Sequence, residues 1–222
     1  MPSGASRVIV INPNSNQAVT EGMALALEPL THPGGPQVEC MTLYEGPFGI
    51  ESQADIDAVV EPLRDVVTSR EDAGAFVIAC YSDPGLPVCR EATDKPVFGT
   101  QECGVLTAMA QGDRFGVIAL SEASIERHVR YLSRMGVLDR MAGERSANLS
   151  VDESATADKA FSHLQAVGRE LRDLDGADVL VLGCAGMAAH RKGLEDSLGV
   201  PVIDPVQAAA VMAISSVIGR TT

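Results

Sequence analysis

Two cysteines each stand at the end of a short apolar run, where a thiol could carry out proton-transfer chemistry. Cys80 ends the run "AFVIAC" at residues 75–80, and Cys184 ends "ADVLVLGC" at residues 177–184. Free cysteine has a pKa of about 8.5, which a helix N-terminus can lower into the range of roughly 3.5 to 7.5. A thiolate and a thiol on opposite faces of a carbon could remove one proton and deliver another. The sequence therefore predicts a pair of acid–base cysteines.

The two cysteines occupy equivalent places in an internal duplication. Cys80 precedes a Pro-Val pair by 16 and 17 residues, and Cys184 precedes another by 17 and 18. A buried cysteine is often only a small hydrophobic residue, but matched positions in two halves favour a shared function. Cys40, Cys89 and Cys103 have no such counterparts, and we expect them to be structural.

Apolar strand-like runs alternate with stretches of helical spacing along the chain, which predicts parallel sheets with right-handed crossovers. Because the pattern occurs twice, we predict an α/β fold of two pseudo-symmetric lobes, each a short parallel sheet flanked by helices, with an active-site cleft between them. The expected lobes are residues 1–105, completed by the C-terminal helix 206–222, and residues 106–205. The expected strands are residues 7–11, 38–43, 75–80, 95–100, 114–120, 177–184 and 200–205. The expected helices are residues 17–30, 53–69, 122–135 and 206–218, together with one that begins near Pro84, one from about Cys103 and one after Met187.

The composition disfavours several functional classes. Thirty acidic residues against 17 basic ones give a formal net charge of −13, which disfavours binding to nucleic acid or an anionic membrane. No apolar run reaches the roughly 18 to 20 residues of a membrane span, and the leader "MPSGAS" has neither the basic start nor the apolar core of an export signal. The five cysteines have no CxxC pair or metal-ligand spacing. We therefore expect a cytoplasmic protein with free thiols.

Three motifs carry a resemblance to a known family. "VINPNSN" (10–16), "IACYSDPGL" (78–86) and "VLGCAGM" (181–187) look like the corresponding motifs of the hydantoin racemases, within the aspartate/glutamate racemase superfamily. The match extends from near the start of the chain to about residue 207. The resemblance implies a two-lobed α/β fold, a small-molecule substrate, no cofactor, catalytic cysteines at Cys80 and Cys184, and a homo-oligomer.

The same superfamily contains allantoin racemases, amino-acid racemases, maleate isomerases and arylmalonate decarboxylases. Glutamate racemases typically continue with Asn-Thr and Thr-His after their two cysteines, whereas here Cys80 is followed by Tyr-Ser and Cys184 by Ala185 and Gly186. That departure counts against a free amino acid. The small residues at 185 and 186 leave backbone N–H groups open to a ring carbonyl.

Polar residues beside the strand ends are candidate substrate ligands. Asn12 and Ser121 end equivalent opening strands and could hold polar groups of a ring, although they could equally form a turn and a helix cap. Asp83 could bind substrate or cap a helix beginning at Pro84. His128 is expected on an exposed helix, solvated or ion-paired. The predicted substrate-binding residues are Asn12, Tyr81, Ser82, Asp83, Ser121, Ala185 and Gly186.

The resulting hypothesis is a cofactor-independent racemase, with no metal, that acts on 5-substituted hydantoins or allantoin by two-cysteine proton exchange at ring C5. A maleate-type cis–trans isomerase and an amino-acid racemase are the alternatives within the superfamily. A non-catalytic small-molecule binding module is the alternative from another class. A redox pair would require the two Cα atoms to lie within about 7 Å, which leaves no room for a substrate.

Overall fold

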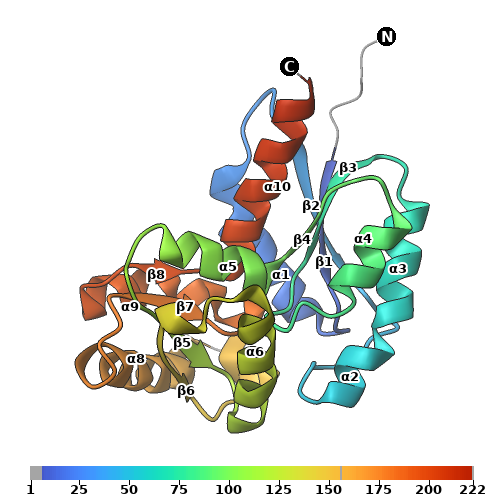
Figure 1. Ribbon diagram of the computed structural model, residues 1–222. Coiled ribbons are helices and arrows are strands. Elements are labelled where there is room, and N and C mark those ends of the chain that lie inside the picture. The colour runs from blue at the N-terminus through green and yellow to red at the C-terminus, as the bar shows by residue number, and fades with distance from the viewer. Residues whose placement is uncertain (1–6, 156, 222) are drawn as a thin grey trace.

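The chain forms two lobes, each built on a four-stranded parallel sheet, in a computed structural model that describes residues 7–155 and 157–221 (Figure 1). The first sheet has the order β2-β1-β3-β4 and the second β6-β5-β7-β8, so one topology occurs twice. This confirms the predicted two-lobed α/β fold. The strands are β1 (Arg7–Asn12), β2 (Gln37–Thr42), β3 (Ala73–Ile78), β4 (Val97–Gly99), β5 (Phe115–Ala119), β6 (Met141–Ser146), β7 (Val179–Leu182) and β8 (Val202–Ile203).

Thirteen helical segments connect and cover these strands in the part of the chain that the structure describes. The segments of the first half are α1 (Gln17–Leu27), η1 (Glu28–Leu30), α2 (Gln53–Ala58), α3 (Val60–Ser69), α4 (Leu86–Ala92) and α5 (Thr100–Met109). Those of the second half are α6 (Glu122–Met135), η2 (Leu138–Arg140), α7 (Val151–Ala155), α8 (Ala157–Asp173), η3 (Ala185–His190), α9 (Arg191–Leu198) and α10 (Pro205–Thr221).

The strand β1 shows why an unbroken apolar run marks the centre of each sheet. Val8 and Val10 belong to a large core that includes residues of both lobes, while Ile9 and Ile11 face a smaller core beneath α3 and α4. Because a central parallel strand is covered on both faces, it is apolar throughout. The strand β5 holds the same position in the second sheet.

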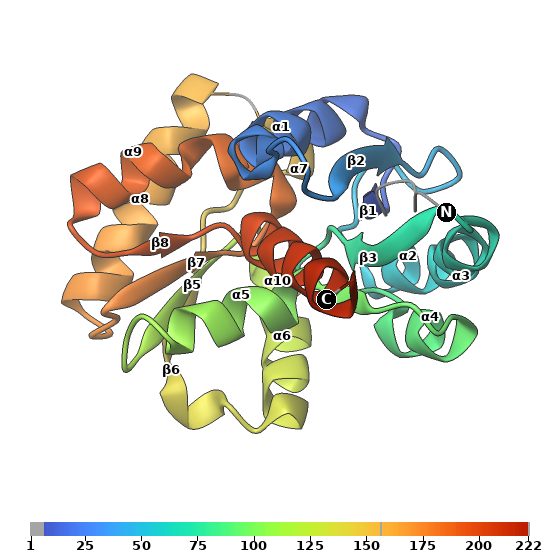
Figure 2. The ribbon, with the colours of Figure 1, turned by 90° about the horizontal axis from the view of Figure 1, so that it is seen from above.

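The helices α5 and α10 tie the two lobes together. The helix α10 packs along β3 and β1 of the first sheet, and α5 contacts β7 of the second, while the two helices pack against each other. Figure 2 shows α10 lying between the two sheets. At this contact a Cβ on Gly104 would come within 2.8 Å of the Pro205 Cβ, so the glycine lets the helices approach closely. The predicted lobe boundary after residue 105 falls inside α5.

Two helix starts differ from the sequence prediction. The helix α4 begins at Leu86 rather than near Pro84, because Asp83 (φ 43°) and Gly85 (φ 64°) turn the chain out of helical geometry first. The helix α5 begins at Thr100, three residues before the expected Cys103. Within the described residues, no helix is both long and apolar enough to cross a membrane.

Candidate active site

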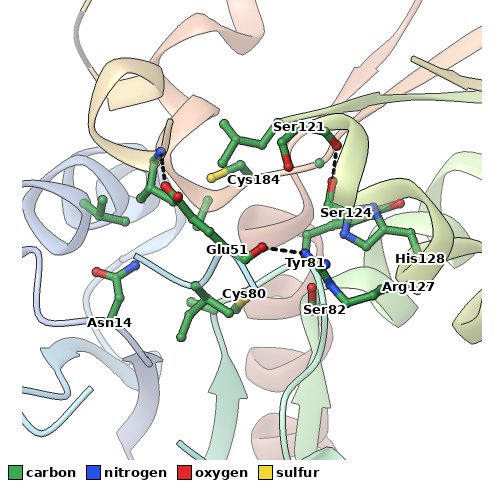
Figure 3. A pocket seen from close by; sticks show the side chains of 17 residues that line it. Asn14, Glu51, Cys80, Tyr81, Ser82, Ser121, Ser124, Arg127, His128 and Cys184 are labelled. Carbon is green, nitrogen blue, oxygen red and sulfur yellow. Dashed lines mark hydrogen bonds between the residues drawn. The ribbon is translucent and has the colours of Figure 1, made fainter. Parts of the chain in front are cut away.

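A pocket between the lobes brings the two cysteines together (Figure 3). It is partly open to solvent. Cys80 and Cys184 both line it, from the carboxyl ends of β3 and β7. The other predicted residues on its wall are Tyr81, Ser82, Ser121 and Ala185.

Equivalent hydrogen bonds fix the backbone just before each cysteine. The Ala79 N–H donates to the Ile11 carbonyl at 2.8 Å, and the Gly183 N–H donates to the Ile118 carbonyl at 2.8 Å. A Cβ on Gly183 would lie 2.6 Å from that Ile118 oxygen, so this position requires glycine. Each cysteine therefore begins the loop at a point where the direction of strand order reverses, which is where open parallel sheets bind ligands.

Burial outweighs the local donors at both thiols. It raises the pKa of Cys80 to about 12, against a hydrogen bond from the Ser82 backbone N–H. Burial also raises the pKa of Cys184, against the Gly186 N–H and the Ser154 hydroxyl. Burial therefore acts against the lowering of the thiol pKa that a helix N-terminus can give, because loss of water disfavours the charged form.

Asp83 caps a different helix from the one expected. Its side-chain oxygens accept hydrogen bonds from the backbone N–H groups of Gln101 and Glu102, each at 2.9 Å, and so cap α5 rather than α4. Burial raises its pKa to about 7 against these two hydrogen bonds. Asp83 lies behind the pocket wall and does not line the pocket.

Asn12 also lies behind the wall, where it organises the loop after β1. It is fully buried, and its amide donates to Asn14 Oδ1 and to Thr20 Oγ1, both at 3.0 Å. Asn14, rather than Asn12, lines the pocket. The family-like "NPNSN" segment therefore reaches the pocket through its second asparagine, two residues beyond the predicted one.

Of the remaining predicted residues, Ser121 lines the pocket and Gly186 does not. Ser121 is the N-cap residue of α6, yet its side chain makes no capping hydrogen bond and lines the pocket. Instead, the Ser124 hydroxyl donates to the Ser121 carbonyl at 2.7 Å. Gly186 is not on the pocket wall, and its N–H faces the Cys184 sulfur.

A contact between Glu51 and Arg127 crosses the pocket, and sequence patterns gave no sign of either residue. Arg127 on α6 donates through Nη2 to the Glu51 carbonyl at 3.0 Å and through Nη1 to the Ala123 carbonyl at 2.7 Å. Its Nε is buried without a hydrogen-bond partner. The Glu51 carboxylate accepts from the Val151 N–H at 3.2 Å. The loop between β2 and α2 therefore reaches two elements of the second lobe.

His128 lines the pocket and is buried, contrary to the expected exposed position. Its Nδ1 lies 2.5 Å from Glu144 Oε1 on β6. The Tyr81 ring meets the imidazole edge-on, with ring centroids 4.9 Å apart. The sequence held one sign that His128 is buried. Ser124, His128 and Leu132 recur every four residues and form the buried face of α6.

The pocket surrounds the two thiols with polar groups. Hydroxyl groups of Ser82 and Ser121, the Asn14 amide and the Arg127 guanidinium supply hydrogen-bonding groups around them. No cluster of three or more His, Cys, Asp or Glu side chains suited to a metal ion occurs in the described ranges. The available chemistry is acid–base or nucleophilic chemistry by cysteine, with hydrogen bonds to developing charge.

The chain is similar to known racemases in sequence and in fold. A hydantoin racemase from Paenarthrobacter aurescens is 36% identical over 220 residues, which cover 95% of this chain and 91% of that protein. The structure of an allantoin racemase from Klebsiella pneumoniae superimposes with a TM-score of 0.89 at 30% identity, over 97% of this chain and 89% of that one. An allantoin racemase from Pseudomonas fluorescens gives 0.91 at 26%, over 96% and 92%. The family model for Asp/Glu/Hydantoin racemase matches residues 8–213, and the chain belongs to that family.

Proposed function

We propose that the protein racemises 5-substituted hydantoins or the related ureide allantoin by proton exchange between two cysteines. The observation that carries the proposal is the placement of Cys80 and Cys184 on one pocket, at matched positions of two equivalent sheets. Relatives named as hydantoin and allantoin racemases support this choice of substrate class. The Tyr-Ser and Ala-Gly continuations after the cysteines favour a cyclic amide over a free amino acid.

The proposed reaction balances without an oxidant or cofactor. One cysteine, as thiolate, takes the C5 proton and becomes a thiol, which leaves an enolate-type anion whose charge is shared with the adjacent ring carbonyl. The other cysteine, as thiol, then gives its proton to the opposite face of C5 and becomes a thiolate. For the other enantiomer the two sulfurs exchange roles.

The pocket offers donors for the oxygen on which charge develops. The Arg127 guanidinium and the Ser121 hydroxyl line the pocket, and the N–H groups beyond the two cysteines lie beside the sulfurs. Donors already in position strengthen as the carbonyl gains negative charge, which stabilises the transition state more than the bound substrate. A thiolate formed in so buried a place is also a strong base, because burial raises its proton affinity.

The test is to incubate an enantiopure 5-alkylhydantoin, and separately allantoin, in deuterated buffer while following optical rotation and deuterium at C5. We expect rotation to decay as deuterium enters, faster than in an enzyme-free control. Cys80→Ser and Cys184→Ser should each slow racemisation by at least about a hundredfold, the lower end of what acid–base groups contribute. Each variant should retain exchange on one enantiomer only.

Cys40→Ser is the matched control, because burial also raises the pKa of the Cys40 thiol but Cys40 lies outside this pocket. It should racemise at the native rate. Absence of racemisation and exchange above the control for both substrates would reject the proposed function. A covalent adduct of either cysteine with an alkene diacid would then support the maleate-type isomerase. We further expect a cytoplasmic homo-oligomer, which cell fractionation and sedimentation would test.

A further inference from the structure

The two cysteines have matched positions in the sheets, but the segments after them differ. After Cys184 the chain enters η3 directly, and η3 continues into α9, so Cys184 is the N-cap residue of a helical segment that runs to Leu198. After Cys80 the chain makes a turn, and α4 begins only at Leu86. A helix N-terminus favours a negative charge, so the backbone supports a thiolate at Cys184 more than at Cys80.

Side chains add to this difference. The Ser154 hydroxyl lies 3.8 Å from the Cys184 sulfur and donates to the Val151 carbonyl at 2.7 Å when the sulfur is a neutral thiol. Rotation about its Cβ–Oγ bond would turn the same proton to a thiolate. At Cys80 the Asp83 carboxyl opposes ionisation and the Arg127 guanidinium favours it.

Glu51 opposes ionisation of Cys184 from the other side of the pocket. Its carboxylate is anchored on the N–H of Val151, one turn before Ser154 on α7. In Figure 3 the Glu51 side chain extends from the Arg127 contact towards Cys184. In addition to the larger effect of burial, the negative charge of Glu51 raises the pKa of the Cys184 thiol.

We propose that Cys184 is the thiol that ionises first, and that Glu51 is a positioning residue that restrains this ionisation while its loop closes the pocket. This inference rests on the proposed two-thiol function for its catalytic meaning. The free protein would then offer Cys184 as the base and Cys80 as the acid. A charge on Cys184 opposes a second charge on Cys80, so Cys80 keeps its proton once Cys184 has ionised.

Other ionisable groups lie around the two sulfurs and must be held constant in any comparison. His128 is engaged with Glu144 beneath the pocket, and His190 Nε2 lies 3.2 Å from the Ser154 carbonyl. Asp83 lies in the turn after Cys80, and the other groups lie on α6, β6, η3 and α7. None of them is altered by a substitution at Glu51.

The test is limited alkylation with iodoacetamide over a pH series, with peptide mass spectrometry to follow each cysteine separately. The pH midpoint of the alkylation rate reports the ionisation of each thiol, whereas the plateau rate at high pH reports how accessible the thiol is to the reagent. Opening of the loop would therefore change the plateau rate and not the midpoint. We expect the midpoint of Cys184 to lie below that of Cys80. Glu51→Gln should lower the Cys184 midpoint by roughly a third to two thirds of a pH unit, the shift that a partly exposed charge pair produces.

Two matched controls sharpen this test. Glu45→Gln changes an exposed carboxylate on the same loop but outside the pocket, and should leave both midpoints unchanged. Ser154→Ala should raise the Cys184 midpoint by removing the donor. Ser197→Ala, which removes a similar hydroxyl-to-carbonyl bond in α9, should not.

A lower midpoint for Cys80, or an unchanged Cys184 midpoint in Glu51→Gln, would overturn the inference. Alkylation needs no substrate, so the two proposals fail separately. The expected midpoints without hydantoin or allantoin turnover would reject only the racemase. Turnover with reversed midpoints would reject only the order of ionisation.

Discussion

The two lobes share their backbone plan but stabilise it with different side chains. In the first lobe, α1 is joined to β2 by a bond between the hydroxyls of Thr20 and Thr42 at 2.6 Å. In the second, α6 is joined to β6 at the corresponding place by His128 and Glu144 at 2.5 Å. Strand order and the backbone before each cysteine are common to both lobes, so the duplicated topology sets where the cysteines lie, while the neighbouring side chains differ.

The same contrast applies to the helices that join the lobes. Asp204, immediately before α10, accepts a hydrogen bond from the Val206 N–H at 2.9 Å and caps its own helix. The helix α5 is capped instead by Asp83, which comes from the turn after Cys80. In the first lobe the loop that carries the cysteine is therefore fastened to the interlobe helix, which links the stability of the fold to the geometry of the site.

The largest stability difference between the lobes should come from the pair His128 and Glu144. Both side chains are almost completely buried, so His128→Leu leaves Glu144 without its partner and should cost about 3–5 kcal/mol. Thr20→Val, the matched change in the first lobe, should cost about 1–3 kcal/mol because it leaves neutral groups unpaired. Urea unfolding of both variants measures the difference. Equal losses of unfolding free energy in the two variants would contradict this difference between the lobes.

A smaller effect should come from filling the space beside the Asp83 cap. A Cβ on Gly99 would lie 2.3 Å from Asp83 Oδ2, so Gly99→Ala must displace the carboxylate. Such overpacking typically costs about 1–3 kcal/mol. Gly22→Ala, in α1 with nothing within 4 Å of the new Cβ, should instead stabilise the protein by up to about 1 kcal/mol. Thermal unfolding of the two variants tests this, and a harmless Gly99→Ala would mean that the cap moves freely.

The elements with an apolar run could be predicted from the sequence, including the edge strands β2, β4 and β8. The sequence predicts both ends of α6 correctly, because its apolar spacing is regular and Gly136 ends it in a left-handed conformation. It does not predict the strand β6, "MAGERS", or the helix α8. Every residue of β6 is partly exposed, so this edge strand lacks the continuous apolar run that identifies β5 and β7.

The site was predictable where it depends on the duplication and unpredictable where it depends on how the lobes meet. Cys80 and Cys184 repeat at matched strand ends, so a comparison of the two halves of the sequence finds them both. Glu51 and Arg127 reach the pocket only because a first-lobe loop lies against α6. Asp83 has the sequence pattern of a local helix cap, since nothing local indicates that its partners are the N–H groups of α5.

The last prediction compares the two capping carboxyls through pH. Burial raises the pKa of Asp83 to about 7 and that of Asp204 to about 6, whereas an unfolded Asp has a pKa of about 3.9. The folded state therefore holds these protons more tightly, and their contribution to stability is complete below about pH 4 and is lost as pH rises through each folded pKa.

Asp83→Asn should cost about 1–3 kcal/mol in acid, because its amide nitrogen cannot accept one of the two hydrogen bonds that the carboxyl oxygens accept. It should flatten the decline in stability between about pH 4 and pH 7, and Asp204→Asn should flatten the range that ends near pH 6. Urea unfolding across the pH series measures both slopes. If Asp83→Asn left the slope intact, the carboxyl would be ionised in the folded protein throughout, and the turn after Cys80 would be held to α5 by a charged cap.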